Sequence, residues 1–106
     1  LVATRCEFAN SGIGAIVYGG SLSSAKFNNC LFHSNKFTGI TVRRSTIHLH
    51  GEATAIHSNR IYGIYANNSG KVIIHLPSHH NTSYNNGGVD RVAVAVSGGT
   101  ITNVED

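Results

Sequence analysis

A His-x-Asn motif that occurs three times contains the residues in this sequence that are best suited to chemistry. The copies are His33-Ser34-Asn35, His57-Ser58-Asn59 and His79-His80-Asn81, and the first two are followed by Lys36 and Arg60. Imidazole changes its charge near neutral pH, and beside lysine and arginine it can bind carboxylates or sulfates through charge-assisted hydrogen bonds. The motifs can act together only if the fold brings them side by side.

The motifs belong to a repeat that runs through most of the chain. Asn10, Asn35, Asn59 and Asn81 recur at nearly constant intervals (35 − 10 = 25, 59 − 35 = 24 and 81 − 59 = 22). A glycine follows four residues after each of the first three, and Ser21, Ser45 and Ser69 are evenly spaced (45 − 21 = 69 − 45 = 24). Independent columns that share one period indicate a repeat architecture in which each unit stacks on the next.

Apolar residues alternate with polar ones inside each unit, and helical spacing is nowhere sustained. Alternation with a period of two predicts short strands that bury one face, about three per unit. The residues expected in the core are Phe8, Phe32, Ile40, Ile47, Leu49, Ile56 and Ile64.

Two architectures could be built from such strands. A propeller or sandwich needs two-residue hairpin loops, yet the only Asn-Gly or Asp-Gly pair is Asn86-Gly87. A parallel solenoid instead repeats the same residue on every turn, about 4.8 Å above the previous one, as the columns require. We therefore predict one all-β domain over residues 1–106, with about four turns, a period of about 24 residues and an irregular loop at about 81–91.

The Asn-x-x-x-Gly-Ile columns, seen at Asn35 to Ile40 and at Asn59 to Ile64, resemble those of right-handed parallel β-helix proteins of the pectin lyase-like superfamily. The resemblance covers roughly residues 3–81, with a weaker turn at 89–104. It implies a right-handed coil and favours an extracellular protein. It implies little about activity, because one fold hosts many functions.

The asparagine column is expected to be structural. Asparagine tolerates left-handed backbone angles, and its amide can bond to the turns above and below. We therefore predict that Asn10, Asn35, Asn59 and Asn81 form an asparagine ladder at one bend of the coil.

The histidines are expected to form an outward row, because Phe32 and Ile56 beside them should point inward. His33, His57 and His79 would stack, with Lys36 and Arg60 as a parallel basic column. Three interpretations stay open: a solvated polar column, a binding strip for an acidic polysaccharide, or a transition-metal site, for which no carboxylate or thiolate completes the shell. His50 and His75, about one repeat apart (75 − 50 = 25), form a second outward pair.

The acidic residues give little support to an enzyme. Enzymes of the pectin lyase-like superfamily typically use clustered acids, and here only the C-terminal pair is close in sequence; the acids are Glu7, Glu52, Asp90, Glu105 and Asp106. We predict no catalytic residues, no cofactor and no metal. The leading hypothesis is a non-catalytic segment that presents stacked polar and basic rows for carbohydrate or protein binding. The alternatives are part of a polysaccharide lyase, hydrolase or epimerase whose catalytic turns lie elsewhere, and a purely structural spacer.

The net charge of +3 is too small for the basic face of a nucleic-acid-binding protein, and no apolar run is long enough to span a membrane.

Cys6 and Cys30 share the repeat spacing (30 − 6 = 24), so they should lie on adjacent turns with Cα atoms about 5 Å apart. A buried pair of thiols is favoured over a disulfide, although the spacing permits either.

The chain begins at Leu1 within a strand-like pattern and without an initiator Met, so we interpret it as a fragment of a longer protein. The first turn carries no visible cap. An uncapped solenoid end exposes unpaired backbone groups and apolar side chains. We therefore expect pairing or stacking through the N-terminal turn, as a homodimer or a longer assembly.

Overall fold

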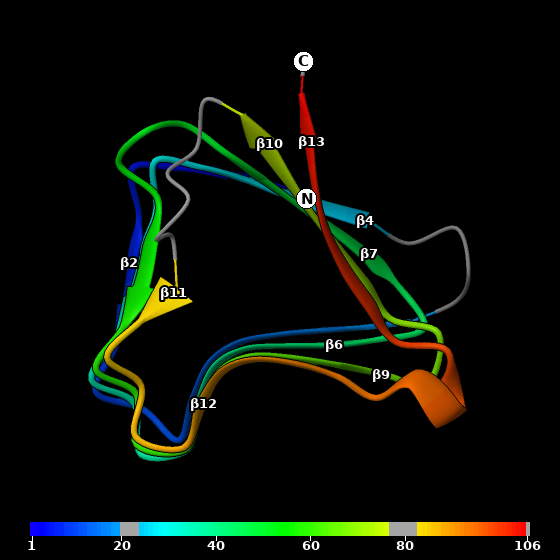
Figure 1. Cartoon of the computed structure of the whole chain (residues 1–106). Helices are drawn as coiled ribbons and strands as arrows, with labels where there is room; N and C mark the ends of the chain where they lie inside the picture. The colour runs from blue at the N-terminus through cyan, green and yellow to red at the C-terminus, as the bar shows by residue number, and fades with distance from the viewer. Residues whose placement is uncertain (20–23, 77–82, 106) are drawn as a thin grey trace.

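The computed structural model describes residues 1–19, 24–76 and 83–105, and these form a parallel β-solenoid. Figure 1 looks along the solenoid axis, and the superposed turns enclose a triangular cross-section with one sheet on each side. The chain runs counter-clockwise as it approaches the viewer, which makes the coil right-handed (Figure 1). The predicted fold of about four turns is confirmed.

Each sheet takes one strand from every turn. The first sheet has the order β1-β4-β7-β10-β13, with bounds Val2–Thr4, Ser24–Asn28, Thr46–His50, Lys71–Leu76 and Thr100–Glu105. The second has the order β2-β5-β8-β11, with bounds Glu7–Ala9, Leu31–His33, Ala55–His57 and Ser83–Tyr84. The third has the order β3-β6-β9-β12, with bounds Ile13–Tyr18, Thr38–Arg43, Tyr62–Asn67 and Val89–Ala93. Among the described residues, the one helical element is a short 3₁₀ turn, η1 (Ala95–Ser97).

The spacing between paired residues on adjacent turns changes along the chain. The intervals for three such pairs, Ser24 with Thr46, Phe32 with Ile56 and Lys71 with Thr100, are 46 − 24 = 22, 56 − 32 = 24 and 100 − 71 = 29. The additional residues lie in bends, because the strand registers within each sheet stay continuous. The stacked strands therefore keep their register, and the bends take up the differences in length between turns.

The core is the stack of inward side chains from all three sheets. Six of the seven predicted core residues are fully buried, and Phe8 is half-buried because it lies on the first turn. The rings of Phe8 and Phe32 stack at 4.9 Å, and Phe27 meets Phe32 edge to face at 5.1 Å. Burial of these side chains, at about 25 cal/mol per Å² of apolar surface, is the main stabilising contribution to the coil.

A stack of asparagine side chains holds the bend between the second and third sheets. Asn35 Nδ2 donates to Asn59 Oδ1 at 2.8 Å, and Asn59 Nδ2 donates to Asn86 Oδ1 at 2.9 Å. The same two oxygens accept from the backbone N–H of Asn35 and of Asn59 at 3.2 and 3.0 Å. The amides therefore bond each turn to the next, and Asn35 and Asn59 are almost completely buried.

Two members of the predicted ladder need correction. Asn10 is exposed, with φ at 58°, and equivalent left-handed angles occur at Ser34, Ser58 and Asn85, one residue before the stack. Asn10 thus occupies the neighbouring column, in which the backbone adopts the left-handed angles that asparagine tolerates. Asn81 lies outside the described residues, and the third stacked amide belongs to Asn86.

Most of the predicted irregular loop follows the regular path instead. Ser83 pairs with Ile56 and Val89 with Tyr62, so both flanking strands keep one offset from the preceding turn (83 − 56 = 89 − 62 = 27). The bend between β11 and β12 therefore has the same length as the bend between β8 and β9. Residues 81 and 82 lie outside the described part of the chain.

The two cysteines lie on adjacent turns as free thiols. The N–H of Leu31, directly after Cys30, donates to the Cys6 carbonyl at 2.9 Å, which is the contact expected of neighbouring parallel strands. Cys30 is buried, but Cys6 is exposed because it lies on the first turn. The expected pair of buried thiols is therefore corrected to one buried and one exposed thiol.

Candidate functional site

A column of stacked rings lies on the outer face of the second sheet. The rings of His33 on β5 and His57 on β8 are 5.1 Å apart and nearly parallel, at 5°. Tyr84 on β11 continues the column, with its ring 5.1 Å from that of His57 and at 11° to it. We call His33, His57 and Tyr84 the ring column.

The local sequence fixes how the ring column points. Phe32 and Ile56 are fully buried, so strand alternation turns the next residue outward. Ser34 and Ser58 then take left-handed angles, and their hydroxyl groups lie 2.8 and 2.9 Å from the Nδ1 atoms of the preceding histidines. Each serine therefore holds its neighbouring imidazole through Nδ1 and leaves Nε2 for another partner.

The outer edge of the first ring is bound by a carboxylate of the same chain. His33 Nε2 lies 2.8 Å from Glu7 Oε2, and the Glu7 side chain is 61% exposed. In the tautomer that is protonated on Nε2, His33 donates to Glu7 and accepts from the Ser34 hydroxyl through Nδ1. An exposed carboxylate can therefore reach the edge of this column and bond to it.

Lys36 and Arg60 occupy equivalent places on neighbouring turns. Both are exposed, and each follows a stacked asparagine directly. The Arg60 N–H donates to the Asn35 carbonyl at 3.0 Å, which fixes the two basic residues one turn apart. His79, the third histidine predicted for the row, lies outside the described residues.

The environment of the ring column disfavours the charged form of its central member. Partial burial, and then the neighbouring His33, lower the pKa of His57 from its ordinary value of about 6.5. At neutral pH His57 is therefore a neutral hydrogen-bonding group.

A shallow groove of about 350 Å³ lies on the outer face of the third sheet. Its lining residues are Ile13, Thr38, Thr41, Arg43, Tyr62, Tyr65 and Asn67. The rings of Tyr62 and Tyr65 are 5.3 Å apart, and the Arg43 guanidinium lies 5.5 Å from the ring centre of Tyr18. The sequence pattern did not identify this groove, because the residues that share a column, such as Ile13, Thr38 and Tyr62, differ in chemical type from turn to turn.

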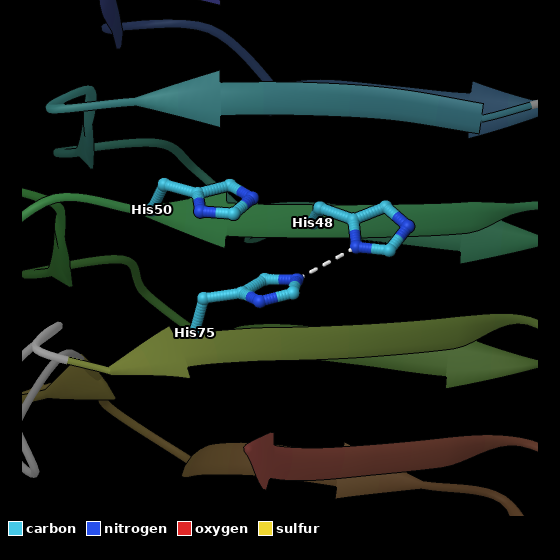
Figure 2. Close-up of side chains that lie close together, drawn as sticks. All are labelled: His48, His50 and His75. Carbon is cyan, nitrogen blue, oxygen red and sulfur yellow. Dashed lines mark hydrogen bonds between the residues drawn. The ribbon is translucent and has the colours of Figure 1, made fainter. Parts of the chain in front are cut away.

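A second group of imidazoles lies on the outer face of the first sheet. His48 and His50 lie on β7 and His75 on β10 (Figure 2). The rings of His50 and His75, the expected outward pair, stack at 3.9 Å. His48 was missed, although the burial of Ile47 and Leu49 on either side indicates that it points outward.

The described acidic side chains do not form a catalytic pair. Glu7 binds His33, and Asp90 accepts from Asn86 N and Nδ2 at 3.1 and 3.0 Å, where it ends the asparagine stack. Glu52 lies in the bend after β7. Within residues 1–19, 24–76 and 83–105, each described carboxylate therefore lies on a different sheet or bend.

No protein-family model, curated protein or solved structure matches this chain. The structural class is therefore defined by the coordinates alone: a parallel β-solenoid with three sheets. In the parts of the chain that the structure describes, no helix has the length and apolar character needed to cross a membrane.

Proposed function

We propose that this chain is a non-catalytic β-solenoid segment that binds an acidic polysaccharide along the ring column. The polymer would run parallel to the solenoid axis, across successive turns. His57 Nε2 and the Tyr84 hydroxyl would bond to its carboxylates and hydroxyls, and Lys36 and Arg60 would supply the positive charge. His33 and His79 belong to the same proposed row.

The observation that carries the proposal is the bond between His33 and Glu7. The 2.8 Å contact joins an exposed carboxylate to the outer edge of the column. His57 presents the same edge one turn further on, with its Nδ1 held by Ser58 in the same way. A uronate carboxylate at His57 would repeat the geometry that Glu7 adopts at His33.

The spacing of the turns also favours a polymer. Equivalent groups in a parallel solenoid recur about every 4.8 Å, close to the length of one sugar unit in an extended polysaccharide. The ring faces cover one another at 5.1 Å, so their edges are the surface available to a ligand. Successive sugars would therefore meet equivalent donors, and several weak contacts would add along the chain.

The proposal includes a place in the pectin lyase-like superfamily and an extracellular setting, supported by the repeat pattern and the coil. The alternative of a polysaccharide lyase, hydrolase or epimerase would require acids outside the described residues. A spacer role would leave the regular ring and basic columns without a use, and a protein ligand would have to present acidic groups at the spacing of the turns.

The test is a titration of the chain with oligogalacturonate at low salt, followed by calorimetry. Wild-type protein should bind, and added salt should weaken the binding because exposed charges are screened. His57→Ala and the double substitution Lys36→Ala/Arg60→Ala should each weaken binding about tenfold, since exposed ion pairs contribute about 0.2–1 kcal/mol each and bonds to a charged group somewhat more.

The matched control is Tyr65→Ala, which alters the groove on the third sheet and leaves the ring column intact. An uncharged oligosaccharide of the same length controls for charge. Equal affinity of wild type and His57→Ala, or loss of binding only in Tyr65→Ala, would contradict the proposal.

We also propose that copies of the chain, when it is isolated from any preceding turns, pair through the first turn. A hollow of about 380 Å³ opens there onto apolar side chains that include Leu1, Phe8 and Phe27. The backbone edges of β1, β2 and β3 lie at the same end. Light scattering over a range of concentrations should give a mass above that of one chain, and a constant monomer mass at high micromolar concentration would refute pairing.

A further inference from the structure

Three imidazoles on the outer face of the first sheet lie close enough to share one ion. One ring nitrogen from each of His48, His50 and His75 lies within 4.8 Å of the nitrogens of the other two. Figure 2 shows the three side chains gathered over the boundary between β7 and β10. We call His48, His50 and His75 the histidine cluster.

The cluster follows from strand geometry. Residues 48 and 50 are two apart on one strand, so they point to the same face. In the first sheet Ile73 is the partner of His48, and Ile74 is the partner of Leu49, which places His75 opposite His50 on the next turn. All three side chains are half-buried on a rigid sheet, where the backbone positions of potential ligands are already fixed.

We propose that the histidine cluster is a binding site for a divalent transition-metal ion of the Zn²⁺ type, held by three imidazole nitrogens. Zn²⁺ binds histidine at about 2.0–2.1 Å in tetrahedral geometry, so two ligand nitrogens are about 3.3 Å apart. His48 Nδ1 and His75 Nε2 are 2.8 Å apart, and the nitrogens of the cluster span up to 4.8 Å. These distances bracket the required separation.

Binding requires small movements of the rings. The hydrogen bond between His48 Nδ1 and His75 Nε2 must open, because its shared proton would be replaced by the ion. The parallel rings of His50 and His75, 3.9 Å apart, must splay so that both lone pairs point to one place. The terminal torsion of an imidazole is broad in energy, so the torsion itself opposes this rotation little.

Three protein ligands leave a fourth position for water. This arrangement differs from closed structural zinc sites, which use four protein ligands. Imidazole also suits Cu²⁺, Ni²⁺ and Co²⁺. The chemistry of the site therefore defines the class of ion, and Zn²⁺ and Co²⁺ serve as the probes.

The experiment is a competitive titration of the metal-free chain with Zn²⁺ against a chromophoric chelator. Wild-type protein should bind one tightly held Zn²⁺ per chain. His48→Gln, His50→Gln and His75→Gln should each reduce the affinity by at least about 100-fold, since even the loss of an outer-shell partner costs about 10–100-fold. The matched control, His33→Gln/His57→Gln, removes two stacked imidazoles from the other sheet and should leave the affinity unchanged.

Lys26 supplies a test that removes no ligand. It is the partner of His48 on β4, so its positive charge lies one strand away from the proposed ion. Lys26→Gln should tighten Zn²⁺ binding about two- to fivefold, as expected for a partly solvated charge. Circular dichroism of every variant separates loss of a ligand from loss of the fold.

Co²⁺ reports the geometry directly. Its visible absorption should show the strong bands of a tetrahedral site in the wild type, and these should disappear in the three single variants of the cluster. Folded His48→Gln and His75→Gln proteins with wild-type Zn²⁺ affinity would overturn the proposal. Equal loss of affinity in the His33→Gln/His57→Gln control would overturn it as well.

Discussion

Replacement of Asn59 by alanine should destabilise the coil more than any other single change in the asparagine stack. The Asn59 side chain makes four hydrogen bonds: Oδ1 accepts from Asn35 N and Nδ2, and Nδ2 donates to Phe32 O and Asn86 Oδ1. Asn35 Nδ2 keeps Phe8 O as a partner, and Asn86 Oδ1 keeps the Asn59 N–H. The buried Asn35 N–H loses the acceptor that it has in the native turn.

The expected loss follows from these partners. A buried donor left unsatisfied costs about 1–3 kcal/mol. Each of the other lost hydrogen bonds costs at most about 0.5–1.5 kcal/mol, and it costs less where the group that loses the bond keeps a second partner. The sum is about 3 kcal/mol, a large share of the roughly 5–15 kcal/mol that stabilises a domain. Equilibrium unfolding in urea, followed by circular dichroism, measures this difference.

Two controls make the test specific. Asn35→Ala should cost less, because Asn35 Oδ1 serves only the N–H of Ser11, which is exposed. Asn10→Ala should also cost less than Asn59→Ala, since the Asn10 side chain stands outside the stack and the change removes only the tolerance of asparagine for its left-handed backbone angle. A loss below about 0.5 kcal/mol for Asn59→Ala, or equal losses at Asn10 and Asn59, would refute the reasoning.

Three other predictions concern different parts of the coil. Gly39→Ala should destabilise by about 2 kcal/mol, because a Cβ there would lie 2.7 Å from Asn59 Nδ2 and 2.8 Å from Gly63 O; urea unfolding measures the loss, and an unchanged midpoint would contradict it. Burial raises the pKa of the Cys30 thiol, so a thiol reagent should label exposed Cys6 quickly and Cys30 only on unfolding, and equal rates would contradict the assignment. The pKa of His57 is lowered in the folded chain, so near and below pH 6.5 the unfolded chain binds more protons than the folded chain. The free energy of unfolding should therefore decrease as the pH is lowered through this range. His57→Gln should reduce that fall between pH 7 and 5, and an identical pH profile in the variant would argue against the lowered pKa.

The fold could be predicted because a solenoid repeats its chemistry at every turn. Strand alternation around Phe32 and Ile56 identified both the buried face and the outward direction of His33 and His57. Local energetics suffice for this, since the stacked strands keep their register even where the spacing between turns changes.

The errors arose at the bends, where spacing is not conserved. Asn10 was assigned to the stack by its distance in sequence from Asn35, but left-handed backbone angles at one position and side-chain bonding at the next both favour asparagine. Asn86 was missed because it lies further along the chain from Asn59 than the repeat period predicts. A fixed period cannot distinguish these adjacent columns.

The sequence predicted only two of the three residues of the histidine cluster, for a different reason. His50 and His75 share a column and were paired by their spacing, whereas His48 approaches His75 diagonally, from the neighbouring column of β7. Such a contact depends on the directions of the side chains as well as on the register.

The central claim, that the ring column binds a uronate polymer, is tested most directly by nuclear magnetic resonance. Labelled protein would be titrated with oligogalacturonate while ring signals of histidine and tyrosine and the side-chain signals of Lys36 and Arg60 are followed. We expect saturable shifts at His57, Tyr84, Lys36 and Arg60, with small changes at Tyr62 and Tyr65. Shifts confined to the groove on the third sheet, or none at saturating ligand, would contradict the claim.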